Sequence, residues 1–374
     1  MKRRTEGLVL GLGFAAALLA ARPAGAEWTS FRGDAALTGV ATSSLPAALA
    51  PRWTFEAGAG FEGAAAIIGD RVYAGSLDGH LYALELATGK LLWKYAAGSP
   101  IKAPAGVRGD TVYVGDEKGI FHAVATKSGE RRFTVTTGGE IFSGAAFAPG
   151  GKVIFGSYDG ALYAVSEKDG ALVWKVETDN YVHATPALVG NDLYFAGCDG
   201  YLRRVSVADG KETLKVRLGS NVAASAAIRD GRAYVGTFDN QVVAVDLAKG
   251  EVLWRYERVT RQFPYYSSAA LTGSAVIVGG RDKALRALDP KTGAERWLYE
   301  TTGRVEASPV VVGDRVFAAS QGGTIFALEV ASGREVWKFD AGGSVTASPA
   351  VGGGFLVIGT DDGVLYGFGE RLSP

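Results

Sequence analysis

The chain has 374 residues, of which 53 are glycine, one is cysteine and 47% are hydrophobic, and its 39 basic residues balance 39 acidic ones. This composition excludes a disordered chain, which buries too little apolar surface to fold, and a disulfide scaffold, which needs more than one thiol. The balanced charge provides no overall field to attract a polyanion, so we expect no nucleic-acid partner.

The first 26 residues have the pattern of a secretory signal peptide. Three basic residues at positions 2–4 precede an apolar run over residues 8–21, and small residues follow at 24–26. The run of 14 residues is shorter than the roughly 20 needed for a membrane-spanning helix. We therefore expect residues 1–26 to be removed, leaving a periplasmic or secreted protein without a transmembrane segment. A retained membrane anchor is the alternative.

After a lead-in over residues 27–50, one unit of about 40 residues recurs eight times. An aromatic or large apolar residue marks each unit, at intervals of 40 to 43 residues. This marker column consists of Trp53, Trp93, Phe133, Trp174, Leu214, Trp254, Trp297 and Trp337. A fixed period of this length indicates a repeat architecture, in which each module packs against its neighbours.

A second column marks a tight hairpin in each unit. Asp-Gly or a related pair occurs eight times, from residues 78–79 to residues 362–363. Such pairs supply the positive φ angles of a hairpin turn, and the runs beside the first pair, 71–76 and 80–86, are strand-like. Each unit therefore reads as four antiparallel strands. Both faces of these strands are apolar, which is typical of stacked propeller blades.

The two ends of the chain complement each other. Trp53 belongs to a fourth strand without a preceding three, whereas the hairpin at 362–363 begins a unit without a fourth strand. Their pairing would complete an eighth blade and remove two exposed sheet edges. The sequence predicts an all-β, monomeric, eight-bladed β-propeller of four-stranded antiparallel blades over residues 51–374. We expect its N-terminal strand to close the ring by pairing with the C-terminal blade.

The unit resembles the repeat of quinoprotein-type propellers. The match is carried by residues 78–79 (Asp-Gly), 81–84 (Leu-Tyr-Ala-Leu), 88–90 (Thr-Gly-Lys) and Trp93, and it recurs over residues 53–368. The resemblance implies that the marker column docks neighbouring blades onto one another. A WD-repeat propeller is disfavoured, because no Trp in the chain is followed by Asp.

Two branches of that family differ in their task. One contains dehydrogenases that hold pyrroloquinoline quinone and Ca²⁺ near the axis, and the other resembles the propeller subunit of the outer-membrane β-barrel assembly machinery, a scaffold without enzymatic activity. A quinone needs an aromatic floor, but six of the seven Trp are in the marker column and the seventh, Trp28, is in the lead-in. We therefore expect an envelope scaffold that binds proteins or peptides, with no catalytic residues, cofactor or metal. The alternative is a quinone-dependent dehydrogenase of alcohols or sugars.

A third column is expected to face or rim the axial channel. Its members lie nine residues after the marker position, with allowance for a three-residue insertion near residue 260. They are Glu62, Lys102, Phe142, His183, Ala223, Tyr266, Glu306 and Thr346. Charged, aromatic and imidazole groups around one axis are suited to hold a peptide or a small ligand. The alternative is a solvated channel wall. The three His fall in different columns, so the spacing predicts no metal site.

The longest connection between units, residues 256–268, contains the insertion. Arg258, Arg261, Phe263 and Tyr265 combine guanidinium and aromatic groups, which are enriched at the energetic centres of protein interfaces. The pattern predicts a partner-binding loop. The alternative is that the aromatic rings cap a blade edge while the arginines are solvated.

Overall fold

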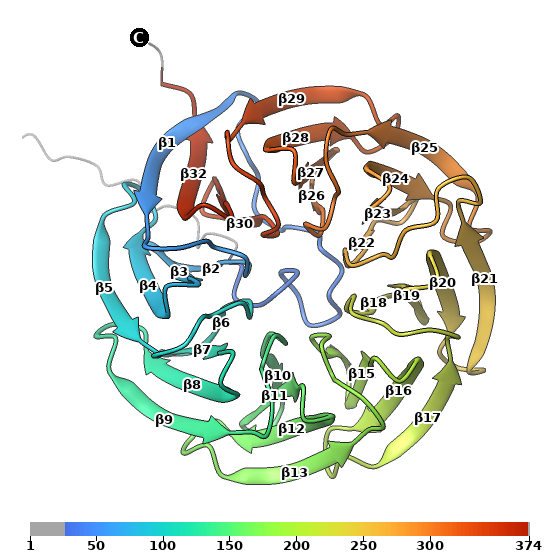
Figure 1. Ribbon diagram of the computed structural model, residues 1–374, viewed down its shortest axis with the longest axis horizontal. Helices are drawn as coiled ribbons and strands as arrows, with labels where there is room; N and C mark the ends of the chain where they lie inside the picture. Colours follow the sequence, from blue (N-terminus) through green and yellow to red (C-terminus); the bar gives the residue numbers. More distant parts are fainter. Residues whose placement is uncertain (1–26, 373–374) are drawn as a thin grey trace, which may run out of the picture.

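The computed structural model describes residues 27–372, so the predicted signal peptide lies outside the described residues. Within this part of the chain, 32 strands form eight four-stranded antiparallel sheets around a common axis (Figure 1). The prediction of an all-β, eight-bladed propeller is confirmed. No helix in residues 27–372 has the length and apolar character required to span a membrane.

We number the blades in chain order, from the axis outward within each blade. Blade 1 consists of β2 (Ala66–Ile68), β3 (Arg71–Gly75), β4 (His80–Glu85) and β5 (Leu91–Ala96), and blade 2 of β6 (Gly106–Arg108), β7 (Thr111–Gly115), β8 (Ile120–Ala125) and β9 (Arg131–Thr136). Blade 3 consists of β10 (Ala146–Ala148), β11 (Lys152–Ser157), β12 (Ala161–Ser166) and β13 (Leu172–Glu177), and blade 4 of β14 (Ala187–Val189), β15 (Asp192–Ala196), β16 (Tyr201–Ser206) and β17 (Glu212–Arg217). Blade 5 consists of β18 (Ala227–Arg229), β19 (Arg232–Gly236), β20 (Gln241–Asp246) and β21 (Glu251–Glu257), and blade 6 of β22 (Ala270–Leu271), β23 (Val276–Gly280), β24 (Ala284–Leu288) and β25 (Glu295–Glu300). Blade 7 consists of β26 (Val310–Val312), β27 (Arg315–Ala319), β28 (Thr324–Glu329) and β29 (Glu335–Asp340), and blade 8 of β30 (Ala350–Gly352), β31 (Phe355–Gly359), β32 (Val364–Glu370) and β1 (Leu49–Glu56).

Blade 1 shows why these sequences form strands. Its middle strands β3 and β4 pair with Tyr73 opposite Ala83, and both side chains are fully buried. The hairpin between the two strands contains Gly79 at φ 82°, a conformation that glycine adopts without steric cost. Because the middle strands are covered on both faces by neighbouring blades, they are apolar throughout rather than alternating.

The ring is closed by the two ends of the chain. Strand β1 pairs antiparallel with β32, from Leu49 opposite Glu370 to Glu56 opposite Val364. The blue β1 therefore lies outside the red β32 in blade 8 (Figure 1). This pairing confirms the predicted closure. The strand begins at Leu49, two residues before the predicted start of the propeller.

The marker column lies between adjacent blades. Trp53 of blade 8 packs against Gly89 of blade 1, where an added Cβ would lie 2.7 Å from the indole ring. The indole N–H of Trp53 also donates a hydrogen bond to the Leu86 carbonyl at 2.7 Å. The Gly contact recurs at Trp93, Phe133, Trp174, Leu214, Trp254 and Trp297. Trp337 of blade 7 instead donates to the Leu49 carbonyl of blade 8, at 3.2 Å.

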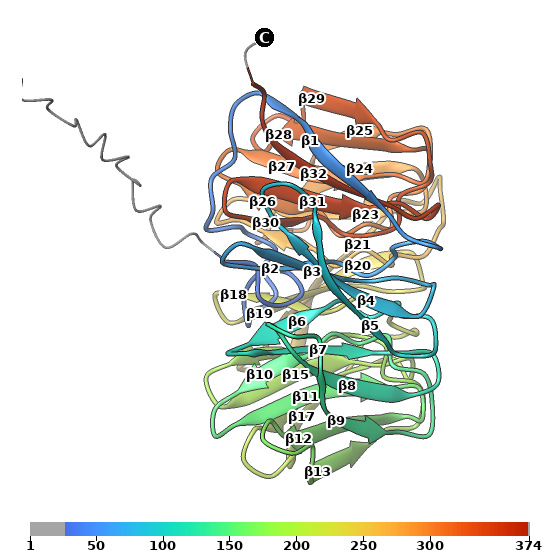
Figure 2. The same cartoon turned by 90° about the vertical axis from the view of Figure 1, so that its left-hand side faces the viewer.

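The lead-in lies across one end of the central channel (Figure 1) and on one face of the ring (Figure 2). Its backbone hydrogen bonds to the innermost strands of six blades, with N···O distances of 2.6 to 2.9 Å. The partners on those strands are Ile67, Val107, Leu188, Ile228, Leu271 and Val311. We call residues 28–41 the plug. The sequence indicated only a lead-in here, because these contacts are made by backbone atoms.

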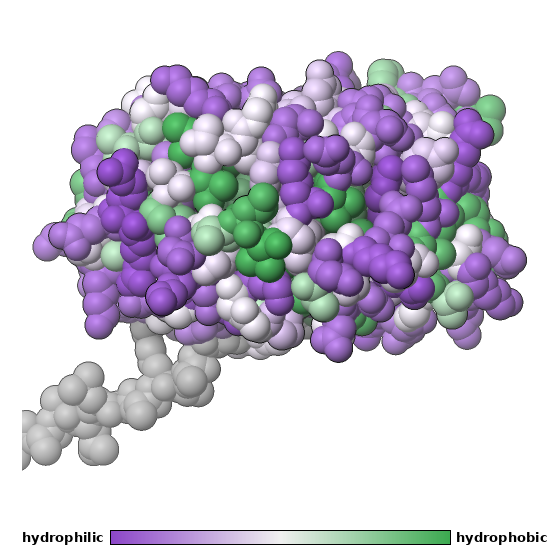
Figure 3. Space-filling model, turned by 90° about the horizontal axis from the view of Figure 1, so that it is seen from below, coloured by the Kyte–Doolittle hydropathy of each residue, from purple (hydrophilic) through white to green (hydrophobic). Residues whose placement is uncertain are grey.

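The outer rim is mainly hydrophilic, with apolar side chains between the polar ones (Figure 3). Leu172 and Val173, on the outermost strand β13, are 60% and 46% exposed. Most of the large apolar side chains are instead buried between blades.

Candidate functional site in the axial channel

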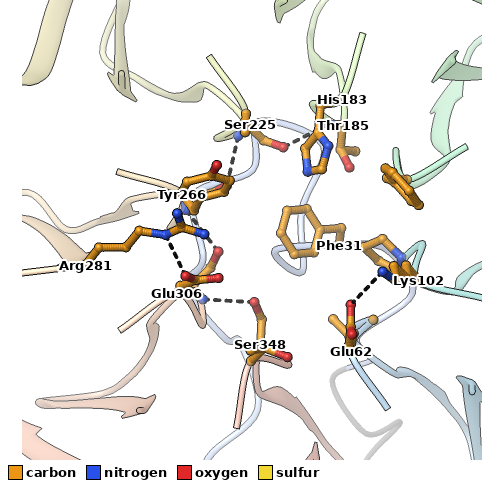
Figure 4. A pocket seen from close by; sticks show the side chains of 18 residues that line it. Phe31, Glu62, Lys102, His183, Thr185, Ser225, Tyr266, Arg281, Glu306 and Ser348 are labelled. Carbon is orange, nitrogen blue, oxygen red and sulfur yellow. Dashed lines mark hydrogen bonds and ion pairs between the residues drawn. The ribbon is translucent and has the colours of Figure 1, made fainter. Parts of the chain in front are cut away.

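A cavity of about 420 Å³ lies on the propeller axis (Figure 4). Every blade contributes to its wall, at the residues that precede its innermost strand, and Phe31 of the plug also lines it. The wall has two tiers. All eight positions of the predicted channel column form one tier, and residues two positions later form a second tier nearer the plug. The structure therefore brings Glu62, Lys102, Phe142, His183, Ala223, Tyr266, Glu306 and Thr346 together around one space.

The charged side chains of the first tier are paired within the wall. Lys102 Nζ lies 3.1 Å from Glu117 Oε1 and 3.7 Å from Glu62 Oε2. On the other side of the pocket (Figure 4), Arg281 Nε lies 2.6 Å from Glu306 Oε1. Burial raises the pKa of Glu62, although Lys102 opposes this shift. Each cation is thus paired with a carboxylate, and because Lys102 is shared by two, these five side chains carry one net negative charge.

Arg281 was not identified from the sequence. It follows β23 at the hairpin of blade 6 and lies over the face of Tyr266, with Cζ 3.8 Å from the ring centroid. A guanidinium group over an aromatic face is held by a cation–π attraction as well as by its ion pair. The only signal in the sequence was its position beside the hairpin pair Asp282-Lys283, and a residue at that position is expected to belong to the turn.

An aromatic and imidazole sector occupies blades 3 and 4. The Tyr158 hydroxyl lies 2.7 Å from His183 Nδ1, and Phe142 packs edge-on against Tyr158. Burial lowers the pKa of His183 to about 4, so the imidazole is neutral at pH 7. Tyr181 stacks on Tyr158 with ring centroids 4.6 Å apart and is 50% exposed. This sector therefore extends from the pocket to the protein surface.

The second tier contains five hydroxyl groups in consecutive blades. Each hydroxyl oxygen accepts a backbone N–H from the equivalent residue of the preceding blade, at 2.8 to 3.0 Å. We call Thr185, Ser225, Ser268, Ser308 and Ser348 the hydroxyl arc. In blades 1 to 3 this tier holds Ala64, Pro104 and Gly144 instead. The sequence signal was a Ser or Thr before the small residue of each innermost strand, which resembled turn composition.

The predicted partner-binding loop is anchored rather than free. Arg258 Nη1 lies 3.3 Å from Asp282 Oδ2, and Arg261 Nη1 lies 3.4 Å from Glu300 Oε1. Phe263 is 44% exposed, as expected for a contact residue. Tyr265 is only 2% exposed, so its assignment as a partner contact is wrong. Its side chain fills the space beside Gly236 in the core, and its hydroxyl accepts a hydrogen bond from Arg286.

Metal ligands do not gather in the described part of the chain. In residues 27–372, no group of three or more His, Cys, Asp or Glu side chains is placed to hold a metal ion.

A family model described as "Outer membrane protein assembly factor BamB" matches residues 47–143, 134–213 and 159–371. The chain belongs to this family. No curated protein sequence matches the chain.

Solved structures share the fold at low sequence identity. BamB from Moraxella catarrhalis has a TM-score of 0.73 and 19% identity, covering 87% of this chain and 99% of its own. The computationally designed Ika8 protein has a TM-score of 0.76 and 19% identity, with coverages of 86% and 99%. Quinohemoprotein alcohol dehydrogenase ADHIIG from Pseudomonas putida HK5 has a TM-score of 0.78 and 14% identity, with coverages of 93% and 82%. At these identities the similarity concerns the propeller fold, which hosts both scaffolds and enzymes.

Proposed function

We propose that the protein is a non-enzymatic scaffold of the bacterial envelope, exported to the periplasm, that binds proteins or peptides during assembly or quality control of outer-membrane proteins. The observation that carries this proposal is the family match over residues 47–371. We further propose that binding takes place at the axial pocket and on the face around its opening, because the repeated positions of the unit are mostly used for packing between blades.

The chemistry of the pocket wall supports a role without a quinone cofactor. Ca²⁺ takes six to eight oxygen ligands, mainly from carboxylates, carbonyls and amides. Among the pocket-lining residues of the described chain, the carboxylates are Glu62 and Glu306, each paired with a cation, and no Asn or Gln side chain is present. Phe31, Phe142 and Tyr266 supply aromatic rings, but Trp is absent from the lining. These residues do not fit pyrroloquinoline quinone with Ca²⁺.

Exposed apolar residues near the pocket support a protein-binding face. Tyr181 is 50% exposed and lies two residues before the pocket residue His183. Val259 and Phe263 are 77% and 44% exposed and lie in the connection that leads to the pocket residue Tyr266. Aromatic side chains beside anchored arginines are typical of interface centres.

Deletion of the gene in its source bacterium tests the envelope role. We expect the amount of folded β-barrel proteins in the outer membrane to fall and to be restored by the wild-type gene. Unchanged amounts under rapid growth and under envelope stress would contradict the proposal.

A double variant tests the face. We expect Arg261→Ala with Phe263→Ala to recover less partner than the wild type after crosslinking in cells, while circular dichroism shows an unchanged fold. A control variant, Val336→Ala, removes an apolar side chain of similar exposure, 40%, from the outer strand β29. Equal recovery of partners by the double variant and the control would remove the loop from the binding face.

A further inference from the structure

The hydroxyl arc presents unused hydrogen-bond donors to the pocket. A hydroxyl group has one donor and two acceptor positions, and in each member of the arc one acceptor position is taken by a backbone N–H. The hydrogen bonds of residues 27–372 include none in which Ser225, Ser268, Ser308 or Ser348 donates its proton to another protein group. Buried donors are normally satisfied, so these protons are suited to an acceptor that enters the pocket.

A buried cation lies beneath the arc. Arg32 of the plug is 1% exposed, and its Nη2 donates to the carbonyl oxygens of Ala269 and Pro309, at 3.2 and 2.5 Å. These two residues directly follow Ser268 and Ser308 of the arc. Arg32 Nε and Nη1 have no hydrogen-bond partner in the described chain. Burial lowers the pKa of Arg32 to about 9, so the guanidinium remains positively charged at neutral pH.

The base of the pocket differs in charge from the first tier. In that tier Lys102 is shared by Glu62 and Glu117, and Arg281 pairs with Glu306, so these side chains carry one net negative charge. The unpaired charge of Arg32 raises the potential under the hydroxyl arc, which favours an anionic group with several acceptor positions. A carboxylate carries one negative charge, whereas a phosphate monoester carries about two near neutral pH, so one cation matches a carboxylate better.

The opposite side of the base is apolar. Pro104, Phe142 and the ring of Phe31 line the pocket where the hydroxyl arc is interrupted. Figure 4 shows Phe31 inside the pocket, between the His183 and Lys102 sides of the wall. This side is suited to an aromatic or aliphatic group, which would gain from leaving water.

We propose that the axial pocket binds a carboxylate attached to an apolar side chain, with the carboxylate at Ser268 and Ser308 and the side chain against Phe31 and Phe142. A peptide with a free C-terminus and a small apolar acid both carry this group. The proposal deepens the proposed function and rests on it in one respect, namely that the pocket is a binding site of the scaffold.

Calorimetric titration of the purified protein tests the ligand chemistry. The probes are N-acetyl-phenylalanine and a hexapeptide that ends in phenylalanine, each compared with its C-terminal amide. We expect the free acids to bind at least about tenfold more tightly than the amides, because a hydrogen bond to a charged group is worth more than one to a neutral group. Tighter binding of the peptide assigns the site to chain termini, and equal binding assigns it to small acids. Equal affinity for acids and amides, or no binding of either acid, would overturn the proposal.

Variants of one blade test the position of the carboxylate. Ser308→Ala removes a donor of the arc and should weaken acid binding about five- to tenfold, whereas Ser308→Thr keeps the hydroxyl and should retain binding. Ser320→Ala is the matched control, because Ser320 is a fully buried serine of the same blade outside the pocket. Should Ser308→Ala fail to fold, Phe142→Ala serves as the test of the apolar side. Equal affinities of the folded pocket variants and the control would refute the proposal.

The two proposals fail separately. Acid binding without any change in outer-membrane proteins after gene deletion would refute the envelope role and leave the pocket chemistry in place. Loss of outer-membrane proteins after gene deletion, without acid binding by the purified protein, would refute the pocket chemistry and leave the envelope role in place.

Discussion

Trp53 joins blade 8 to blade 1, so its substitution measures how firmly the ring is held closed. Its side chain packs against Gly89 and Gly367 and donates to the Leu86 carbonyl at 2.7 Å. Trp53→Phe keeps an aromatic ring, as Phe133 does between blades 2 and 3, but leaves the Leu86 carbonyl without its donor. We expect it to lower the free energy of unfolding by about 1 kcal/mol. Trp53→Ala also empties the space between the two glycines and should cost about 3–5 kcal/mol.

Urea unfolding followed by far-ultraviolet circular dichroism measures both changes without relying on the fluorescence of the removed indole. Trp174→Phe is the control, because Trp174 packs against Gly210 within the ring and its N–H donates to the Val207 carbonyl at 3.0 Å. Similar losses for Trp53→Phe and Trp174→Phe would show that the closing interface is equivalent to one within the ring. A loss below about 1 kcal/mol for Trp53→Ala would refute the assignment of Trp53 as a docking residue.

Three further predictions follow from the interfaces and the pocket. Gly89→Ala should destabilise the protein by about 1–3 kcal/mol more than Gly69→Ala in urea unfolding, because both glycines have positive φ but only Gly89 lies against Trp53; equal losses would contradict this. The pKa of His183 falls from 6.5 to about 4 on folding, so the unfolded chain binds more protons between these values and stability should decrease as the pH falls through them; His183→Gln should reduce this slope between pH 7 and 5, and an unchanged slope would refute the role of His183. Incubation with pyrroloquinoline quinone and Ca²⁺ should give no dye-linked oxidation of alcohols or sugars, and robust turnover would favour the dehydrogenase alternative.

The architecture could be predicted because each structural requirement repeats. A large apolar residue, Trp in six of the eight units, faces a Gly at seven blade interfaces, and the hairpin turns impose positive φ at fixed positions. Because both requirements recur at nearly constant spacing, the period and the number of blades could be predicted from the sequence. The pairing of β1 with β32 could be predicted by counting strands. The N-terminal end of the propeller has a fourth strand without a blade, and the C-terminal blade lacks a fourth strand of its own.

The candidate site was predicted only in part. The first tier was predicted because the residue types at its eight positions differ, whereas the neighbouring positions of the units carry uniformly small residues. The hydroxyl arc was missed, since Ser in a Gly-rich unit resembles a turn residue until its backbone partner in the preceding blade is known. Adjacent Tyr265 and Tyr266 were both predicted to be accessible, as a partner contact and as a channel residue, but neighbouring residues in an extended chain point in opposite directions. Tyr265 therefore enters the core, and Tyr266 lines the pocket.

The plug and the closing strand have a consequence for the order of assembly. Residues 28–56 are made before the strands that they contact, and their partners include β26, the turn after β30, and β32, which are made late. The plug can pair with β2 and β6 early, but β1 has no partner strand until β32 is made, and until then the blades form an open arc. Strand β1 is thus the last to pair, which makes a nascent or truncated chain dependent on protection of its unpaired edges.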